Sequence, residues 1–312
     1  MKTVSLEELL EAGCHFGHQV SRQNSKAKDY IFESRDKIHI IDLEKTKEGL
    51  EDAGKFIKET AKKNGTLLVL GTKRQAETVL REERARMESA DVDGMYFVTK
   101  RWIGGTLTNF QEVAKNYKKL KDLTARLKDP KDRAKYTKKE LSGWDKDRAK
   151  LDAFYGGTAN MPATPSAIFI IDTHLEHVAA GEARRAGVPT VGITDTNADP
   201  TIITYPIPAN DDAVGSLKLI IGYIFDAWAE GRKQMGEDAL KAAEDAAKEA
   251  AKAEKAQEAA TAKAAKAPAK EEKKAEAKKE PKAANHDAKT GEAEVIAKQG
   301  PAKKPAAKAE KK

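Results

Sequence analysis

The sequence predicts an α/β protein built on a doubly wound parallel sheet in three layers. Short apolar runs alternate with segments of helical periodicity, and polar residues bound each run, as is typical of buried parallel strands. Parallel strands joined through helices need right-handed crossovers, which place helices on both faces of the sheet. Five main strands are expected, at residues 38–41, 67–70, 95–98, 167–172 and 188–195.

Helices are expected before and between these strands. Ser5 and Glu8 have capping-box spacing, so a short helix should begin there and end near Gly13. Gly65 and Gly187 are suitable helix stops, because glycine adopts the left-handed conformation of a C-terminal cap. The other predicted helices span residues 46–63, 75–89, 174–186 and 211–229, and a short extended piece covers 202–207.

A helical insertion interrupts this alternation after the third strand. Residues 107–128 and 138–154 have helical periodicity, and Pro130 lies in the connection between them. The first of these helices carries an apolar seam close to heptad spacing, at Val113, Tyr117, Leu120, Leu123, Thr124 and Leu127. This seam predicts an antiparallel hairpin that projects from the body. The predicted boundaries are 1–105 and 156–232 for the body, 106–155 for the hairpin and 233–312 for a tail.

The tail has the composition of a disordered segment. No aromatic residue follows Trp228, and the 77 residues from Gly236 onward include 27 Ala, 19 Lys and 15 Asp or Glu. Such a segment cannot bury enough apolar surface to offset the entropy lost on ordering. Its first part has high helix propensity but no apolar stripe.

Positive charge is concentrated in the predicted hairpin. The net formal charge of the chain is +7, whereas residues 115–150 alone hold 14 Lys or Arg against 6 Asp or Glu. A solvated helix face is the ordinary alternative for a Lys-rich helix. The imbalance nevertheless favours a surface that binds a polyanion, because a solvated face usually carries paired charges.

Cysteine usage and hydropathy indicate a cytosolic protein. Cys14 is the only cysteine, which excludes an internal disulfide and fits a reducing compartment. The sequence shows no signal peptide and no run of about 18 apolar residues, so no membrane association is expected.

Residues 99–110 combine two cations, an indole and a glycine turn. Lys100, Arg101 and Trp102 precede Gly104 and Gly105. Cations neutralise phosphates and an indole can stack on bases, so this turn is expected to contact RNA. Trp102 has two possible roles: stacking on RNA, or packing the base of the hairpin against the body.

Polar residues also follow the other predicted strands, where open α/β sheets bind ligands. Lys73 and Arg74 could contact an RNA phosphate or be solvated cations at a helix start, and the glycine motifs of dinucleotide and P-loop sites are absent from the sequence. The strand-end aspartates are either acids and metal ligands or caps of helices and turns. His18 joined to Asp195 or Asp211 would form a mixed ligand set that suits zinc. No cofactor is expected.

Six sequence blocks, in this order, resemble the bacterial small-subunit ribosomal protein S-two family. They are residues 15–19, 37–46, 71–74, 101–109, 195–200 and 207–213. The resemblance implies a flavodoxin-like body with a protruding coiled-coil hairpin. It also implies a non-catalytic protein of the cytoplasmic ribosome that binds small-subunit ribosomal RNA and neighbouring ribosomal proteins, including the large S-one protein. No small-molecule substrate is implied.

We therefore expect a structural RNA-binding protein. The alternative is an α/β enzyme that acts on a phosphorylated small molecule through strand-end aspartates, and a protein-binding module is a third possibility. The residues expected to contact RNA are Arg22, Lys26, Lys28, Lys73, Arg74, Lys100, Arg101, Trp102, Asn109, Lys115, Lys118, Lys119, Lys121 and Arg126.

Overall fold

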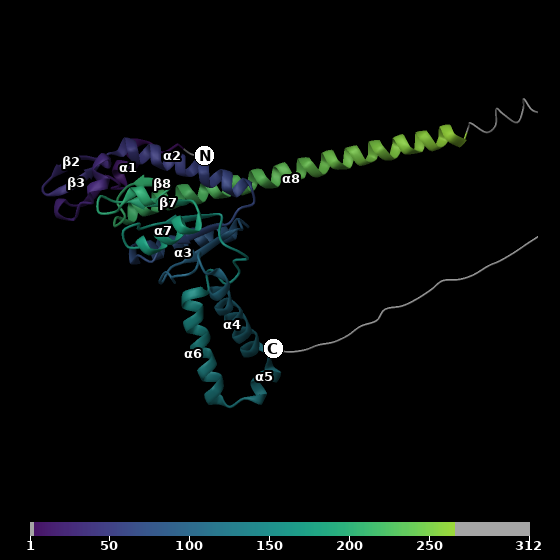
Figure 1. Ribbon diagram of the computed structural model, residues 1–312, viewed down its shortest axis with the longest axis horizontal. Coiled ribbons are helices and arrows are strands. Elements are labelled where there is room, and N and C mark those ends of the chain that lie inside the picture. The colour runs from purple at the N-terminus through teal and green to yellow at the C-terminus, as the bar shows by residue number, and fades with distance from the viewer. Residues whose placement is uncertain (1–2, 266–312) are drawn as a thin grey trace, which may run out of the picture. The chain divides into compact units, whose positions relative to one another are not determined.

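The computed structural model describes residues 3–265 (Figure 1). Its central sheet has five parallel strands, β4 (Leu67–Leu70), β5 (Met95–Val98), β6 (Ala167–Ile170), β7 (Thr190–Thr194) and β8 (Tyr205–Pro208). They pair in the order β5-β4-β6-β7-β8. Counted along the chain, this is the flavodoxin-like order, in which the chain changes direction between the first and third strands, here β4 and β6. The predicted doubly wound, five-stranded sheet is confirmed.

One predicted strand of this sheet belongs to a different sheet. Residues 38–41 form β3 (Ile38–Ile41), which pairs antiparallel with β1 (Phe16–Gln19) and β2 (Ile31–Arg35). The turn between β2 and β3 places Asp36 and Lys37 at positive φ, as tight hairpin turns require. A four-residue apolar run does not itself distinguish a parallel strand from a half-buried hairpin strand, and the prediction for this run was wrong.

The fifth parallel strand is instead β8, which was predicted only as a short extended piece. It contains Pro206 and Pro208, which lack backbone N–H donors. Proline is tolerated in a sheet at an edge strand, and β8 is the edge opposite β5.

Helices cover both faces of the parallel sheet. α2 (Leu43–Lys62), α3 (Arg74–Ser89) and the first part of α8 (Val214–Ala265) pack on one face, against Leu67 and Val69 of β4. α7 (His177–Ala186) packs on the other, against Leu68 and Leu70. Successive side chains of β4 therefore enter opposite cores, as a strand buried on both faces requires. The short α1 (Leu6–Glu11) begins at the predicted capping box, formed by Ser5 and Glu8.

Between β5 and β6 the chain forms three helices that we call the arm: α4 (Phe110–Lys128), α5 (Pro130–Lys135) and α6 (Lys138–Tyr155). α4 and α6 lie side by side (Figure 1). The predicted connection is itself helical, because Pro130 occupies the first position of α5 and Asp129 caps it. α4 buries Val113, Tyr117 and Leu120, whereas α6 buries no side chain. The regular coiled-coil packing expected between them stays a prediction.

The last helix is longer than predicted. It was expected to end at residue 229, but α8 continues to Ala265. The contacts between residues divide the chain into two compact units, and the boundary lies after Ala247. The rest of the predicted tail, residues 266–312, lies outside the described residues, and the domain boundaries given above stay predictions. Within the described range, no helix combines the length and apolar character needed to cross a membrane.

Gly49 provides a test of how closely α2 approaches β8. A Cβ atom at this position would lie 2.5 Å from the carbonyl oxygen of Pro206, so Gly49→Ala should lower the free energy of unfolding by about 2 kcal/mol, measured by urea denaturation. Ala has the higher helix propensity, so the loss must come from the contact.

Gly143→Ala in α6 is the matched control. A Cβ atom there meets nothing within 4 Å, and the substitution should raise the free energy of unfolding by up to about 1 kcal/mol. Equal stability of Gly49→Ala and the unmodified protein would contradict the described packing of α2 on β8.

Candidate nucleic-acid interface

The turn between β5 and the arm is built around a buried tryptophan. Trp102 is 7% exposed, and its indole N–H donates to Glu182 Oε2 of α7 at 2.9 Å. Gly105 has a φ of 91°, which favours glycine over other residues. A buried indole has no free face for a base. Of the two roles considered for Trp102, the structure therefore supports packing of the arm against the body.

Exposed polar side chains lie on either side of this turn. Arg101 is exposed and makes no ion pair with the described residues, and Arg74 is exposed at the first position of α3. Lys100 lies 2.9 Å from Glu77 of α3, and because an exposed ion pair of this kind stabilises little, the ammonium remains available to a phosphate. Asn109 precedes α4 and is exposed, without a capping hydrogen bond from its side chain.

The arm continues this cationic surface. Lys118, Lys119 and Lys121 are exposed on α4, and none of them makes an ion pair with a described residue. Lys115 pairs with Glu112 at 2.6 Å, and the guanidinium of Arg126 lies 5.9 Å from the centroid of the Trp144 ring on α6. The predicted excess of unpaired positive charge is therefore present on α4.

A second group of predicted cations lies before β2. Arg22 and Lys28 are exposed in two short 3₁₀ helices, Val20–Arg22 and Ser25–Tyr30. Lys26 donates to Asp199 at 2.6 Å and to Thr201 at 3.3 Å, which ties this loop to the loop after β7. Arg22 and Lys28 thus keep free charge, whereas that of Lys26 is shared with Asp199.

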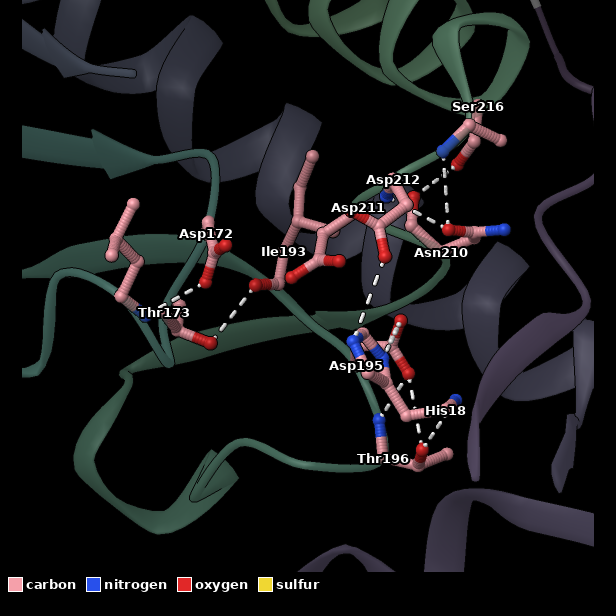
Figure 2. A network of polar contacts seen from close by, with 12 residues as sticks. His18, Asp172, Thr173, Ile193, Asp195, Thr196, Asn210, Asp211, Asp212 and Ser216 are labelled. Atoms are coloured by element: carbon pink, nitrogen blue, oxygen red, sulfur yellow. Dashed lines mark hydrogen bonds and ion pairs between the residues drawn. The ribbon is translucent and has the colours of Figure 1, made fainter. Parts of the chain in front are cut away.

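The carboxyl ends of the parallel strands carry a group of charged side chains that we call the carboxylate cluster: Asp172, Asp195, Asp211, Asp212, Lys73 and His18. Lys73 Nζ lies 3.2 Å from Asp172, 2.8 Å from Asp211 and 2.7 Å from Asp212. His18 lies between Asp195, at 2.9 Å, and Asp212, at 3.6 Å (Figure 2). Three carboxylates thus neutralise the ammonium of Lys73, which was predicted to contact RNA.

Comparison with known proteins decides the family. The model of the family described as ribosomal protein S2 matches residues 9–231. A small ribosomal subunit protein uS2 from Corynebacterium diphtheriae is 42% identical over 254 residues, which cover 81% of this chain and 93% of the relative. The protein of that name from Corynebacterium jeikeium is 44% identical over 253 residues, 81% of this chain and 89% of its own.

The chain belongs to the ribosomal protein S2 family. The resemblance carried by the six sequence blocks is confirmed. This is a family of structural proteins.

The carboxylate cluster is unsuited to a phosphorylated substrate. Burial, together with the charges of Asp172 and Asp195, raises the pKa of Asp211 to about 7. The hydrogen bond to Asp195 raises the pKa of His18 in spite of its burial. The cluster has four carboxylates against two cationic groups, and the raised pKa of Asp211 indicates that added negative charge is unfavourable there, so a phosphate would be repelled.

The structure also brings together the three residues considered for a metal site. Ligand atoms of His18, Asp195 and Asp211 lie within 4.8 Å of one another. A tetrahedral zinc site needs ligand atoms about 3.3 Å apart. In addition, the Lys73 ammonium already lies beside Asp211, where a metal cation would be repelled. The sequence raised metal binding by this set only as an alternative to structural caps, and no metal was expected.

Sequence reasoning missed Glu182. Oε1 of this residue accepts hydrogen bonds from the backbone N–H groups of Leu107 and Thr108, at 3.0 and 3.1 Å, and from the Thr108 hydroxyl at 2.9 Å. The available signal was its position in α7, three residues after Ala179 and among the small residues that face the sheet. A glutamate on a buried helix face needs partners from another segment.

The carboxylate cluster makes stability depend on pH in a defined direction. The ordinary pKa of Asp211 is 3.8, so between about pH 4 and about pH 7 the folded protein binds more protons than the unfolded chain. The free energy of unfolding should therefore fall as pH rises, by about 2 kcal/mol from about pH 5.5 to about pH 7. His18, whose pKa is also raised, extends this fall above pH 6.5. Urea denaturation in chelator-containing buffers measures it.

Asp211→Asn should flatten this dependence, since the substituted side chain does not titrate. Asp226→Asn removes an exposed carboxylate that pairs with Arg86 on the surface, and the pH dependence should persist. A steep dependence that survives Asp211→Asn would show that another group is responsible.

Proposed function

We propose that the chain is a structural protein of the small ribosomal subunit that binds ribosomal RNA through the arm and the turn at its base. Family membership supports the structural role in translation and a location in the cytoplasmic ribosome. The observation that carries RNA binding is the group of exposed lysines on α4 that make no ion pair with a described residue, together with the exposed Arg74 and Arg101 of the body.

The distribution of charge favours one orientation on RNA. The arm and its base present free cations, whereas the carboxylate cluster places excess negative charge beside the carboxyl ends of β6, β7 and β8. An RNA backbone is attracted to the first surface and repelled by the second. Most of the binding free energy should therefore come from phosphate contacts on the arm side.

The residues proposed to contact RNA are those that keep exposed polar groups in the structure. Trp102 and Lys73 are left out because the first is buried and the second is neutralised internally. Lys26, Lys100 and Lys115 are exposed although each pairs with a carboxylate, so each can exchange that partner for a phosphate. The proposed set is Arg22, Lys26, Lys28, Arg74, Lys100, Arg101, Asn109, Lys115, Lys118, Lys119, Lys121 and Arg126.

Co-sedimentation tests the proposal as a whole. The tagged full chain should migrate with small ribosomal subunits from a lysate, and nuclease treatment should release it. An enzyme would not co-sediment at all, and a purely protein-binding module would remain bound after nuclease treatment.

Salt dependence tests the arm lysines. Replacing Lys118, Lys119 and Lys121 together by Gln should lower affinity for small-subunit RNA by about tenfold or more at low salt. It should also reduce the slope of log affinity against log salt concentration by about 2 to 3, because three phosphates lose their neutralising partners. Filter binding over a salt series measures both quantities.

Replacing Lys55, Lys62 and Lys63 by Gln is the matched control. This triple variant has the same change in charge, but α2 lies on the opposite face of the sheet from α7 and Trp102. Its salt slope should equal that of the unmodified chain. Equal losses in the two triple variants would show that net charge, and not the arm, determines binding.

A separate apolar surface fits a protein neighbour. Around α1 and the antiparallel sheet, six large apolar side chains are exposed: Leu6, Leu10, Phe16, Val20, Phe32 and Ile38. Leu10, His15, Phe32 and Ile40 line a cleft of about 340 Å³ there. Contiguous exposed apolar side chains are typical of interaction sites. We propose that this surface contacts a neighbouring ribosomal protein, with the S-one protein as the candidate from the family resemblance.

Phe32→Ser tests this surface. Phe32 is 72% exposed, so the substitution should leave stability unchanged while lowering affinity for the purified S-one protein by about tenfold. Leu240→Ser is the control, since Leu240 is 68% exposed on α8 and lies outside the apolar surface. Unchanged binding by Phe32→Ser in a pull-down titration would assign the S-one contact to another surface.

A further inference from the structure

Glu182 is a buried carboxylate at the joint between the body and the arm. The residue is 2% exposed, on the face of α7 that packs against the sheet. Its two oxygens accept four hydrogen bonds, at 2.9 to 3.1 Å, from Trp102, Leu107 and Thr108. All four donors belong to the short segment that leads from β5 into α4, so one side chain of the body holds the entry of the arm.

The carboxylate stays charged without a cationic partner. It makes no ion pair among the described residues, and its charge is balanced by N–H and O–H dipoles alone. Burial acts to raise the pKa of Glu182, but the backbone donors of Thr108 and Leu107, together with Trp102, outweigh it and lower the pKa. Any movement of the entry segment would remove donors from a buried charge, which is strongly unfavourable.

The exit of the arm is held by a different element. The N–H of Phe97 in β5 donates to Gly157 O at 3.1 Å, and the Tyr96 hydroxyl donates to Asn160 O at 3.3 Å. A Cβ atom at position 157 would lie 2.2 Å from Phe97 O, so this approach requires glycine. Attachment to both α7 and β5 restricts a rotation of the arm that either contact alone would leave free.

We propose that Glu182 is a positioning residue that sets the direction of the arm and so aligns the arm cations with those of the body on one RNA segment. The inference rests on the proposed function, since it explains how Arg74 and Arg101 on the body act together with Lys118 and Lys119 on α4. Two groups of cations held in a fixed relation bind one polyanion more tightly than two that move independently, because less orientational freedom is lost on binding.

Distance measurement tests the direction of the arm without RNA. Cys14 is the only cysteine and is buried, so spin labels can be attached selectively at Ala85→Cys on α3 and Ser142→Cys on α6, both exposed sites. The distance distribution between the labels should be narrow in the full chain with Glu182 and broad in Glu182→Gln. A distribution that stays narrow in Glu182→Gln overturns the proposal.

Glu176→Gln is the matched control. Glu176 is also a buried glutamate next to α7, but its side chain accepts from Thr72 of the body and does not contact the arm. The distribution should remain narrow in this variant even if its melting temperature falls. A broad distribution in Glu176→Gln would show that loss of stability alone frees the arm, and would overturn the proposal.

RNA binding gives the second readout. Glu182→Gln should lower affinity for small-subunit RNA about tenfold and also reduce the salt slope, since fewer phosphates are neutralised at once. A variant whose only defect is lower stability should keep the salt slope of the unmodified chain. Trp102→Phe keeps an aromatic ring but removes one of the four donors to Glu182. It should lower RNA affinity by a smaller factor, about threefold, and reduce the salt slope less. This variant replaces Glu182→Gln in the test if Glu182→Gln fails to fold.

The two proposals fail in different ways. If the unmodified chain binds no small-subunit RNA while the label distances still broaden in Glu182→Gln, the proposed function is overturned and the control of arm direction by Glu182 is supported. If the unmodified chain binds RNA and Glu182→Gln binds with the same affinity and slope, the proposed function is supported and the positioning role of Glu182 is overturned.

Discussion

Buried charge in this protein has to be balanced inside the fold, and the way each charge is balanced decides which cations remain for other partners. In the carboxylate cluster, the ammonium of Lys73 forms ion pairs with Asp172, Asp211 and Asp212. Its charge is therefore not available to an external partner. At Glu182 the balance comes from dipoles of the entry segment. No cation is used there, and Arg101 remains exposed one residue before Trp102.

The parallel sheet could be predicted because its strands are short apolar runs separated by helices. Two strands, β3 and β8, were not assigned correctly in this way. Residues 38–41 are apolar enough for a buried strand, but they pair with two neighbouring strands of the N-terminal segment, and an apolar run by itself does not show which strands will pair with it. β8 was expected only as a short extended piece, and its two prolines, Pro206 and Pro208, are tolerated because β8 lies at the edge of the sheet. α8 continues beyond Trp228, where its apolar pattern ends, because the residues that follow also have high helix propensity.

In the candidate interface, the exposure of a side chain was predictable only where it does not depend on a partner from a distant segment. Exposed lysines of α4 follow from the charge imbalance of residues 115–150, and they need no distant partner to be exposed. The positions of Trp102 and Lys73 depend on Glu182 and Asp211, which are 80 and 138 residues away in the chain. Local sequence therefore does not separate solvated cations from those neutralised by the fold, and it did not identify Glu182 as the acceptor for the Trp102 indole.

The place where this fold usually binds a ligand is occupied by its own side chains. In doubly wound sheets the carboxyl ends of the strands near the switch point form the binding crevice. Here Lys73 follows β4 and Asp172 follows β6, on either side of that point, and their ion pair joins the two ends. A phosphate-sized anion would have to displace this pair among further carboxylates, which is electrostatically unfavourable. Under the proposed function, a polyanion would therefore be held by exposed cations outside this crevice, and the arm, which leaves the sheet after β5, carries several of them.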